Sequence, residues 1–206
     1  MKLYYIPGAC SLASHIVLHE TGATFEIERV DGATHTTETG ADFYKVHSKG
    51  YVPALRLEDG ELLTEGPSIM QFIADNSGKT SLSPSLGSIA RAKLQSGLNF
   101  ISTELHKSFS PLFKKDSTED EKTAARKKVA LRLDDVEAEL SDGRAFFLGE
   151  DFSIADAYLF TVANWTKPTG LGLGERPNLI AYVGRVAERP SVQAALLAEG
   201  LINKAA

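Results

Sequence analysis

The sequence predicts a chain in two parts: an α/β part with the order β-α-β followed by β-β-α, and then a part made only of helices. Two observations predict this division. Short apolar runs bounded by turn residues fill positions 1–77, whereas longer runs with helical periodicity fill positions 88–206. Between them, residues 78–87 are rich in Ser, Pro and Gly, which is typical of a linker. We therefore expect domains at 1–77 and 88–206, joined by a linker at 78–87.

The first three elements form one unit. Leu3–Ile6 is a short apolar run that ends at a Pro-Gly pair, which indicates a buried strand followed by a loop. Ser11–Glu20 has helical spacing and is followed by Gly22, a residue suited to the end of a helix. Phe25–Val30 alternates apolar and polar residues, as a half-exposed strand does. A β-α-β unit this short predicts two parallel strands.

A hairpin and a helix complete the first part. Residues 31–50 are polar, and we expect a loop there with a short helix near Phe43. Two apolar runs, Val52–Leu57 and Leu62–Thr64, flank an Asp-Gly pair, which is a good hairpin signal. The Glu65–Ser68 turn then leads into an amphipathic helix.

Everything after the linker has helical periodicity. We expect helices at Ile89 to about Phe109, Thr118–Leu140 and Ser153–Trp165, another opened by Pro177 and broken by Pro190, and a short last helix at Val192–Leu201. Ser153 and Asp156 have the spacing of a capping box. We interpret this pair as structural, because a helix that is apolar almost throughout must have its first turn capped inside the protein.

Composition excludes several classes of function. The 206 residues carry a net charge of −5, so the chain has no overall field that would attract nucleic acid or an anionic membrane. No stretch is apolar enough to span a bilayer, and the first residues lack the pattern of a secretory signal. A single cysteine cannot form an internal disulfide. We expect a cytoplasmic protein without a metal site.

The lone cysteine, Cys10, lies one residue before the first predicted helix. Helix N-termini present free N–H groups and a partial positive charge, which favour a thiolate. A small buried residue is an equally good interpretation from position alone. No second cysteine follows at C-x-x-C spacing, so any disulfide must form with an outside thiol.

Two further turns could bind a ligand. A cis bond at Val52-Pro53 would leave the Val52 backbone open to an extended peptide-like ligand, although an ordinary trans proline at a strand start is commoner. At Glu65-Gly66, a carboxylate and a helix N-terminus together could hold the zwitterion of an amino acid. A plain helix cap, with Thr64 or Ser68 as the capping residue, explains the same segment.

A polar stripe lies on the first helix after the linker. Asn99, Thr103 and His106 are spaced so that they share one helical face, and Lys107 borders it. Such a stripe is usually just the solvated side of a helix, so the residues alone leave a catalytic role for His106 open.

Taken together, these patterns resemble a cytosolic glutathione transferase with a thioredoxin-like first domain. The run from Met1 to Leu12, the Leu63–Gly66 run, the Glu104–Lys107 run and the Ser153–Ala157 run are similar to the bacterial beta class. The resemblance covers essentially the whole chain.

The resemblance implies roles for individual residues. Cys10 and His106 would be the catalytic residues beside the sulfur of glutathione. The glutathione-binding residues would be Ser11, His35, Val52, Pro53, Glu65, Gly66, Asn99, Thr103 and Lys107. The family further implies a homodimer, glutathione as co-substrate and no tightly bound cofactor.

Two positions depart from the beta-class pattern. His35 stands where many members carry a Lys that contacts the glycine carboxylate of glutathione. Since an ordinary histidine is mostly neutral at pH 7, we expect that contact to be weaker or pH-dependent. Tyr51 stands where a Gln often precedes the Val-Pro pair, and it would add a stacking surface or narrow the pocket.

The expected function is detoxification by activation of the glutathione thiol for attack on small hydrophobic electrophiles, with thiol-disulfide or peroxide reduction through Cys10 as a further capacity. Two alternatives stay open. One is a glutaredoxin-like enzyme that forms a Cys10–glutathione mixed disulfide, and the other is a non-catalytic binding protein for apolar ligands. Whether Cys10 attacks or only supports the glutathione thiolate is also left open by the residues.

Overall fold

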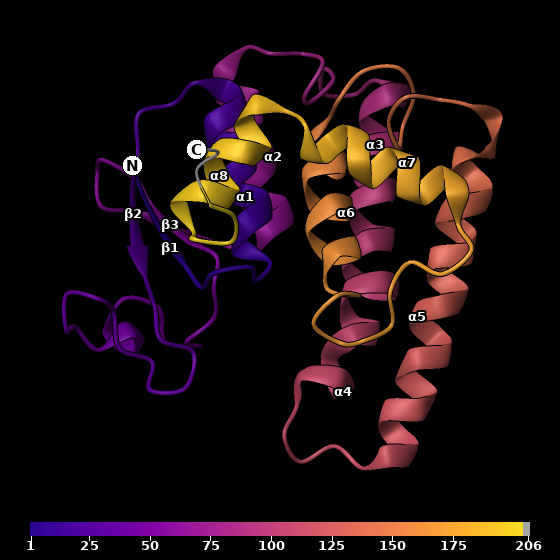
Figure 1. The fold of residues 1–206 in the computed structure, drawn as a ribbon. Coiled ribbons are helices and arrows are strands. Elements are labelled where there is room, and N and C mark those ends of the chain that lie inside the picture. Colours follow the sequence, from indigo (N-terminus) through magenta and orange to yellow (C-terminus); the bar gives the residue numbers. More distant parts are fainter. Residues whose placement is uncertain (204–206) are drawn as a thin grey trace. The chain divides into compact units, whose positions relative to one another are not determined.

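The computed structural model describes residues 1–203, which form two compact units (Figure 1). The first unit contains Met1–Lys79 and the chain from Arg189 onward, and the second contains Thr80–Glu188. The first unit holds the sheet, and the second is built from helices. The predicted fold class, an α/β thioredoxin-like domain followed by helices, is therefore confirmed.

A four-stranded sheet forms the frame of the first unit. Its strands are β1 (Lys2–Tyr5), β2 (Glu26–Arg29), β3 (Ala54–Arg56) and β4 (Leu62–Thr64), in the order β2-β1-β3-β4. β1 and β2 are parallel, as the β-α-β pattern predicted, with Leu3 opposite Ile27. β3 pairs antiparallel with both β1 and β4, so the Asp-Gly hairpin is also present.

The two faces of the sheet are covered differently. Helices α1 (Ser11–Thr21), α2 (Gly66–Ser77) and α8 (Pro190–Ala198) lie together on one side of it (Figure 1). On the other face, Tyr4 packs with Phe43 of the short 3₁₀ helix η1 (Phe43–Lys45). Alternate residues of a strand point to opposite faces, which is why Leu3 and Tyr4 are both buried although they are neighbours.

Helix α8 differs from the sequence expectation, which placed residues 88–206 in one helical domain. In the structure α8 packs on α1 and belongs to the first unit. Polar pairs hold it there: the Glu199 carboxylate contacts His15, and Glu20 accepts hydrogen bonds from Arg189 and Ser191. These partners are more than 160 residues apart in sequence, at separations of 184, 169 and 171, so no local pattern could indicate them.

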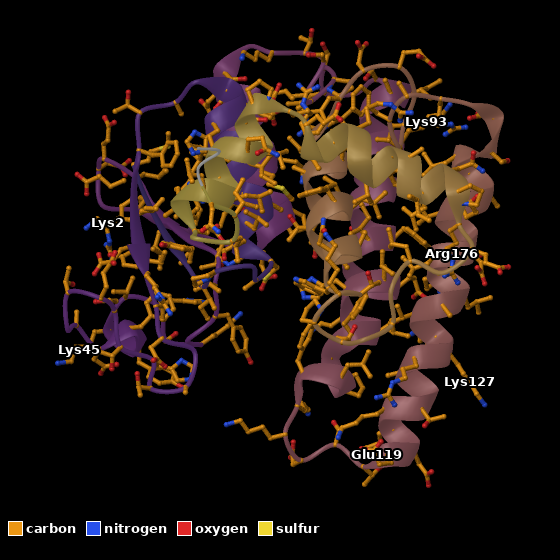
Figure 2. The ribbon with its side chains drawn as sticks, in the orientation of Figure 1. Lys2, Lys45, Lys93, Glu119, Lys127 and Arg176 are labelled. Carbon is orange, nitrogen blue, oxygen red and sulfur yellow. The ribbon has the colours of Figure 1, made fainter. Side chains whose placement is uncertain are left out.

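The second unit is a helical bundle. Its elements are α3 (Ile89–Phe100), the π-helical turn η2 (Ile101–Leu105), the 3₁₀ segment η3 (His106–Phe109), α4 (Ser110–Phe113), α5 (Glu119–Glu139), η4 (Leu140–Asp142), α6 (Ile154–Asn164) and α7 (Pro177–Ala187). Charged side chains such as Lys127 project from the outer face of α5 (Figure 2). Every helix within residues 1–203 is too short or too polar to cross a membrane.

The helix expected from Ile89 to about Phe109 is not continuous. It is α-helical only to Phe100 and then widens into the π turn before tightening into the 3₁₀ segment. Hydroxyl groups compete for its carbonyls: Thr103 donates to the Asn99 carbonyl (3.0 Å) and Ser108 to that of Glu104. Such back-bonding bends helices, and π turns often accompany functional sites.

The capping box of α6 is present, as its spacing predicted. The buried Asp156 carboxylate accepts hydrogen bonds from the Ser153 N–H (2.8 Å) and hydroxyl (2.9 Å). It also accepts from the Phe147 N–H (2.7 Å) and the Tyr182 hydroxyl (2.9 Å). Burial raises the pKa of the Asp156 carboxyl, while these four donors oppose the rise. Asp156 thus anchors α6, α7 and the loop before α6.

Candidate active site

Cys10 occupies the position before α1 that the sequence predicted. It is the N-cap residue of that helix and is partly exposed, and its sulfur is not part of a disulfide. Its Sγ donates a hydrogen bond to the Val52 carbonyl over 3.3 Å. The contact joins the loop after β1 to the segment that enters β3, two parts of the chain that are 42 residues apart. The interpretation of Cys10 as merely a buried residue does not fit its partial exposure.

The loop before Cys10 is fixed from two sides. The Ile6 N–H donates to the Ser11 hydroxyl, and that hydroxyl donates to the Ile6 carbonyl, both over 3.2 Å. From the other side, the Gly8 N–H donates to the Glu199 carboxylate over 2.8 Å. Gly8 has φ 71°, a left-handed conformation that glycine adopts readily. The position of Cys10 therefore depends on residues from both ends of the chain.

Ser11 was expected to bind glutathione. Its side chain is fully buried and its hydroxyl is engaged with Ile6. The Ser11 hydroxyl therefore holds the loop, and the fully buried residue does not present it to a ligand.

The Val52-Pro53 bond is cis, the less common of the two arrangements that the sequence allowed. Pro53 is buried and Val52 is partly exposed. The Val52 carbonyl accepts from Cys10, and a Cβ added to Gly66 would lie 3.7 Å from the Pro53 ring. These contacts bring Cys10, the Val-Pro pair and the start of α2 together within the first unit.

Glu65 is held in a conformation that is rare for a residue with a side chain. Its φ is 68°, and it precedes the first residue of α2 with its side chain exposed. A non-glycine residue in this region costs on the order of 1–3 kcal/mol, and such residues cluster at functional sites. The Glu65 carboxylate makes no capping hydrogen bond to its helix. The N-cap position of α2 thus belongs to Glu65, and to neither Thr64 nor Ser68, the two residues that the plain helix cap required.

His35 lies in the long loop between β2 and η1, also with positive φ, at 53°. Its ring packs against that of Tyr44, with centroids 4.6 Å apart. Gly50 lies under this pair: an added Cβ would approach Tyr44 to 2.7 Å and His35 Nδ1 to 3.0 Å. Tyr51 is 66% exposed, so its ring is available to a ligand. The two positions that depart from the beta-class pattern thus both carry rings, His35 in the loop before η1 and Tyr51 in the segment between η1 and β3.

The remaining candidate residues belong to the second unit. Asn99, Thr103 and Lys107 are exposed, whereas His106 is mostly buried. Because the π turn lies between Asn99 and His106, their spacing does not give the single straight stripe that an uninterrupted α-helix would.

His106 has a well-defined environment. Its Nδ1 lies 2.6 Å from the Tyr158 hydroxyl, and its ring meets the Trp165 ring edge-on at a centroid distance of 4.7 Å. Burial lowers the pKa of His106 to about 4, and the nearby Lys107 charge adds to this effect. His106 is thus neutral at pH 7. Trp165 also meets Phe109 and Phe113, which creates an aromatic cluster in the second unit.

The sequence did not indicate two residues that hold His106 and the loop before Cys10. Tyr158 belongs to α6, whose nearly continuous apolar character gave no sign of a polar contact. Glu199 lies near the end of the chain, where a carboxylate normally suggests an exposed surface; here its side chain is fully buried. Among the residues that the structure describes, no group of three or more His, Cys, Asp or Glu side chains is arranged to hold a metal ion.

Comparisons with known proteins show which family the chain resembles. The family model for the glutathione S-transferase N-terminal domain matches residues 8–76, and the model for the C-terminal domain matches residues 100–190. The chain is 48% identical to glutathione S-transferase GstA of Escherichia coli O157:H7 over 201 residues, which is 98% of this chain and 100% of the relative.

Solved structures give the same result. A bacterial beta-class glutathione S-transferase from Sphingomonas chungbukensis has a TM-score of 0.95 at 48% identity, covering 98% of this chain and 100% of that one. A sphingomonad glutathione S-transferase in complex with glutathione has a TM-score of 0.93 at 46% identity, with 98% and 100% coverage.

Proposed function

The chain belongs to the glutathione S-transferase family, and from this premise we propose that it joins the sulfur of glutathione to small hydrophobic electrophiles. It is an enzyme that uses glutathione as co-substrate. The observation that carries the assignment of the site is the convergence of Cys10, Val52 and Gly66, from three separate segments, in the first unit.

Each part of this convergence suits one part of glutathione. The main chain of Val52 offers the edge on which the cysteinyl unit pairs as an added strand, next to Pro53. The N–H groups at the start of α2, beginning with Gly66, suit the γ-glutamyl carboxylate, and the exposed Glu65 carboxylate suits its ammonium group. The strained backbone of Glu65 supports this role.

His35 is proposed to contact the glycine carboxylate of glutathione. Its ring orientation is set by Tyr44 and by the absence of a side chain at Gly50. The helical domain is proposed to contribute Asn99, Thr103 and Lys107 to binding and His106 to catalysis. We propose a glutathione-binding domain at 1–77, a linker at 78–87 and a helical domain that begins at residue 88. Helix α8 is added to the first of these, because it packs on α1.

The chemistry starts with loss of the glutathione S–H proton to water. Cys10 and the N–H groups at the start of α1 stabilise the resulting thiolate. The thiolate then forms a bond to an electrophilic carbon, and in a substitution the leaving group departs with the bonding electrons. Aromatic residues such as Phe113 and Trp165 suit a hydrophobic electrophile.

A second activity is favoured by the partly exposed thiol of Cys10, which is not part of a disulfide. Its thiolate can attack one sulfur of glutathione disulfide, which forms a Cys10–glutathione mixed disulfide and releases one glutathione thiolate. A further glutathione then attacks the mixed disulfide and regenerates Cys10. The non-catalytic binding protein considered above is not favoured by the family membership.

Intact mass measurement after incubation with glutathione disulfide tests the site. We expect a gain of one glutathionyl group in the wild type and none in Cys10→Ala. Conjugation assays on Cys10→Ser separate the two activities, because thiol activation by neighbouring donors survives this change whereas the mixed disulfide does not. A glutathionylated Cys10→Ala variant would contradict the assignment.

Glu65→Gln and Glu61→Gln form a matched pair for the binding site. Both residues are exposed and lie near the same hairpin, but only Glu65 directly precedes the first residue of α2. Loss of one charge-assisted hydrogen bond predicts a rise in KM for glutathione of roughly 10-fold in Glu65→Gln and no change in Glu61→Gln. Equal KM values in the two variants would remove Glu65 from the site.

The cellular setting is also proposed. A cysteine outside any disulfide suits the reducing cytoplasm, and the family suggests a homodimer. Sedimentation velocity measures the second point directly: a species of one chain at micromolar concentration would refute it.

A further inference from the structure

The imidazole of His106 is held by two residues of the α6 segment. Tyr158, in the middle of that helix, is 3% exposed, and its hydroxyl lies 2.6 Å from His106 Nδ1. Trp165, at the end of the same helix, presents its ring edge-on to the imidazole, with an angle of 78° between the rings. The ring plane and the direction of Nδ1 are therefore both set from α6.

The relative basicity of the two groups indicates which atom donates across the 2.6 Å contact. An imidazole nitrogen is a far better acceptor than a phenol oxygen, and the phenol O–H is a good donor. The Tyr158 O–H thus donates to His106 Nδ1.

The state of the ring follows from its surroundings. Burial lowers the pKa of His106 to about 4, so the imidazole is neutral at pH 7 and carries one N–H. Since Nδ1 accepts from Tyr158, the proton must lie on Nε2. The ring consequently offers, at Nε2, a hydrogen-bond donor that has no positive charge.

We propose that Tyr158 is a positioning residue that holds His106 as the Nε2–H tautomer, so that His106 takes part in catalysis as a neutral hydrogen-bond donor. The inference rests on the proposed function, in which His106 is a catalytic residue. A neutral N–H stabilises the thiolate as it forms but does not return a proton to it, so the sulfur stays nucleophilic.

Two variants separate positioning from stability. Tyr158→Phe removes the hydroxyl that contacts His106. Tyr182→Phe removes another buried tyrosine hydroxyl of the same unit, which donates to Asp156. We expect Tyr158→Phe to lower kcat roughly 10-fold, with KM for glutathione changed less than 2-fold, whereas Tyr182→Phe lowers the melting temperature and leaves kcat unchanged.

A double variant shows whether Tyr158 acts through His106. If it does, Tyr158→Phe lowers kcat no further in a His106→Ala background. An equal loss of kcat in both backgrounds would refute the positioning role. If His106→Ala lowers kcat but Tyr158→Phe does not, only this inference fails. If His106→Ala leaves kcat unchanged, the proposed catalytic role of His106 fails, and the positioning role fails with it.

Nitrogen-15 NMR of the wild-type side chain provides a readout that a structural role would not move. The His106 signals are assigned by their loss in His106→Gln. We expect a proton on Nε2 and an unprotonated, hydrogen-bonded Nδ1 at pH 7, and a mixture of tautomers in Tyr158→Phe. A proton on Nδ1 in the wild type would overturn the inference whatever the kinetics show.

Discussion

Replacing Asp156 by alanine removes a fully buried carboxylate that accepts four hydrogen bonds in the second unit. Its two oxygens accept from the N–H groups of Phe147 and Ser153 and from the hydroxyls of Ser153 and Tyr182. The side chain is fully buried, so water does not replace it freely. The substitution thus leaves donors without their acceptor at the start of α6 and on α7.

The expected loss follows from these donors. Each buried donor left unsatisfied costs about 1–3 kcal/mol. The two N–H groups and the Tyr182 hydroxyl together predict a loss of about 4 kcal/mol, allowing for the partial relaxation that makes such contributions less than additive. For a chain of this size, 4 kcal/mol corresponds to a fall of about 10 °C in melting temperature.

Thermal unfolding at one fixed protein concentration measures this loss, because association would shift the midpoint. Asp156→Asn is the matched control: it keeps the shape and one acceptor oxygen, and we expect it to lose about half as much. If the melting temperature of Asp156→Ala falls by less than 2 °C, or if the two variants lose equal amounts, the hydrogen bonds at Asp156 do not stabilise the fold as reasoned.

Three other changes test separate parts of the molecule. Gly50→Ala forces a Cβ to 2.7 Å from the Tyr44 ring, so we expect a loss of at least about 2 kcal/mol in unfolding free energy and a raised KM for glutathione. Glu199→Ala removes the buried partner of His15, and urea unfolding should show a loss of about 3 kcal/mol. His106 has a folded pKa of about 4, below its unfolded value, so stability is lost as the pH falls from about 6.5 to 4, by roughly 3 kcal/mol. His106→Gln should abolish that part of the pH dependence in urea titrations.

Each of these three has its own control. Gly60→Ala shares the positive φ, but an added Cβ there meets nothing within 4 Å, so it isolates the effect of strain without a clash. Glu188→Ala removes an exposed carboxylate near the start of α8 and should be neutral. For His106, a pH dependence between 6.5 and 4 that is identical in His106→Gln would show that its burial does not govern this range.

Much of the candidate site could be predicted from the chain itself. A cysteine directly before a helix, a Val-Pro pair before a strand and a Glu-Gly pair at a helix start are local features, and the structure places all three where they were expected. The same is true of the Ser153–Asp156 capping box. Local features of this kind depend on the geometry of one turn, which neighbouring residues determine.

Other parts of the site could not be predicted in this way. The π turn after Phe100 breaks the spacing on which the stripe from Asn99 to His106 was based. The Ser11 hydroxyl bonds to the Ile6 backbone because of the conformation of the loop between them. The sequence of that loop is equally compatible with a hydroxyl that faces a ligand.

The sequence by itself determined the chain order of the main strands and helices and the identity of the thiol, because hydrophobic periodicity and turn residues act over a few positions. Only the tertiary structure decided which distant groups meet. Tyr158 contacts His106 across 52 residues, and Glu199 contacts His15 across 184. Such pairs form because packing brings whole elements together, and no local pattern records which side chains then face each other. The environment of His106 and the anchoring of the loop before Cys10 are therefore properties of the fold.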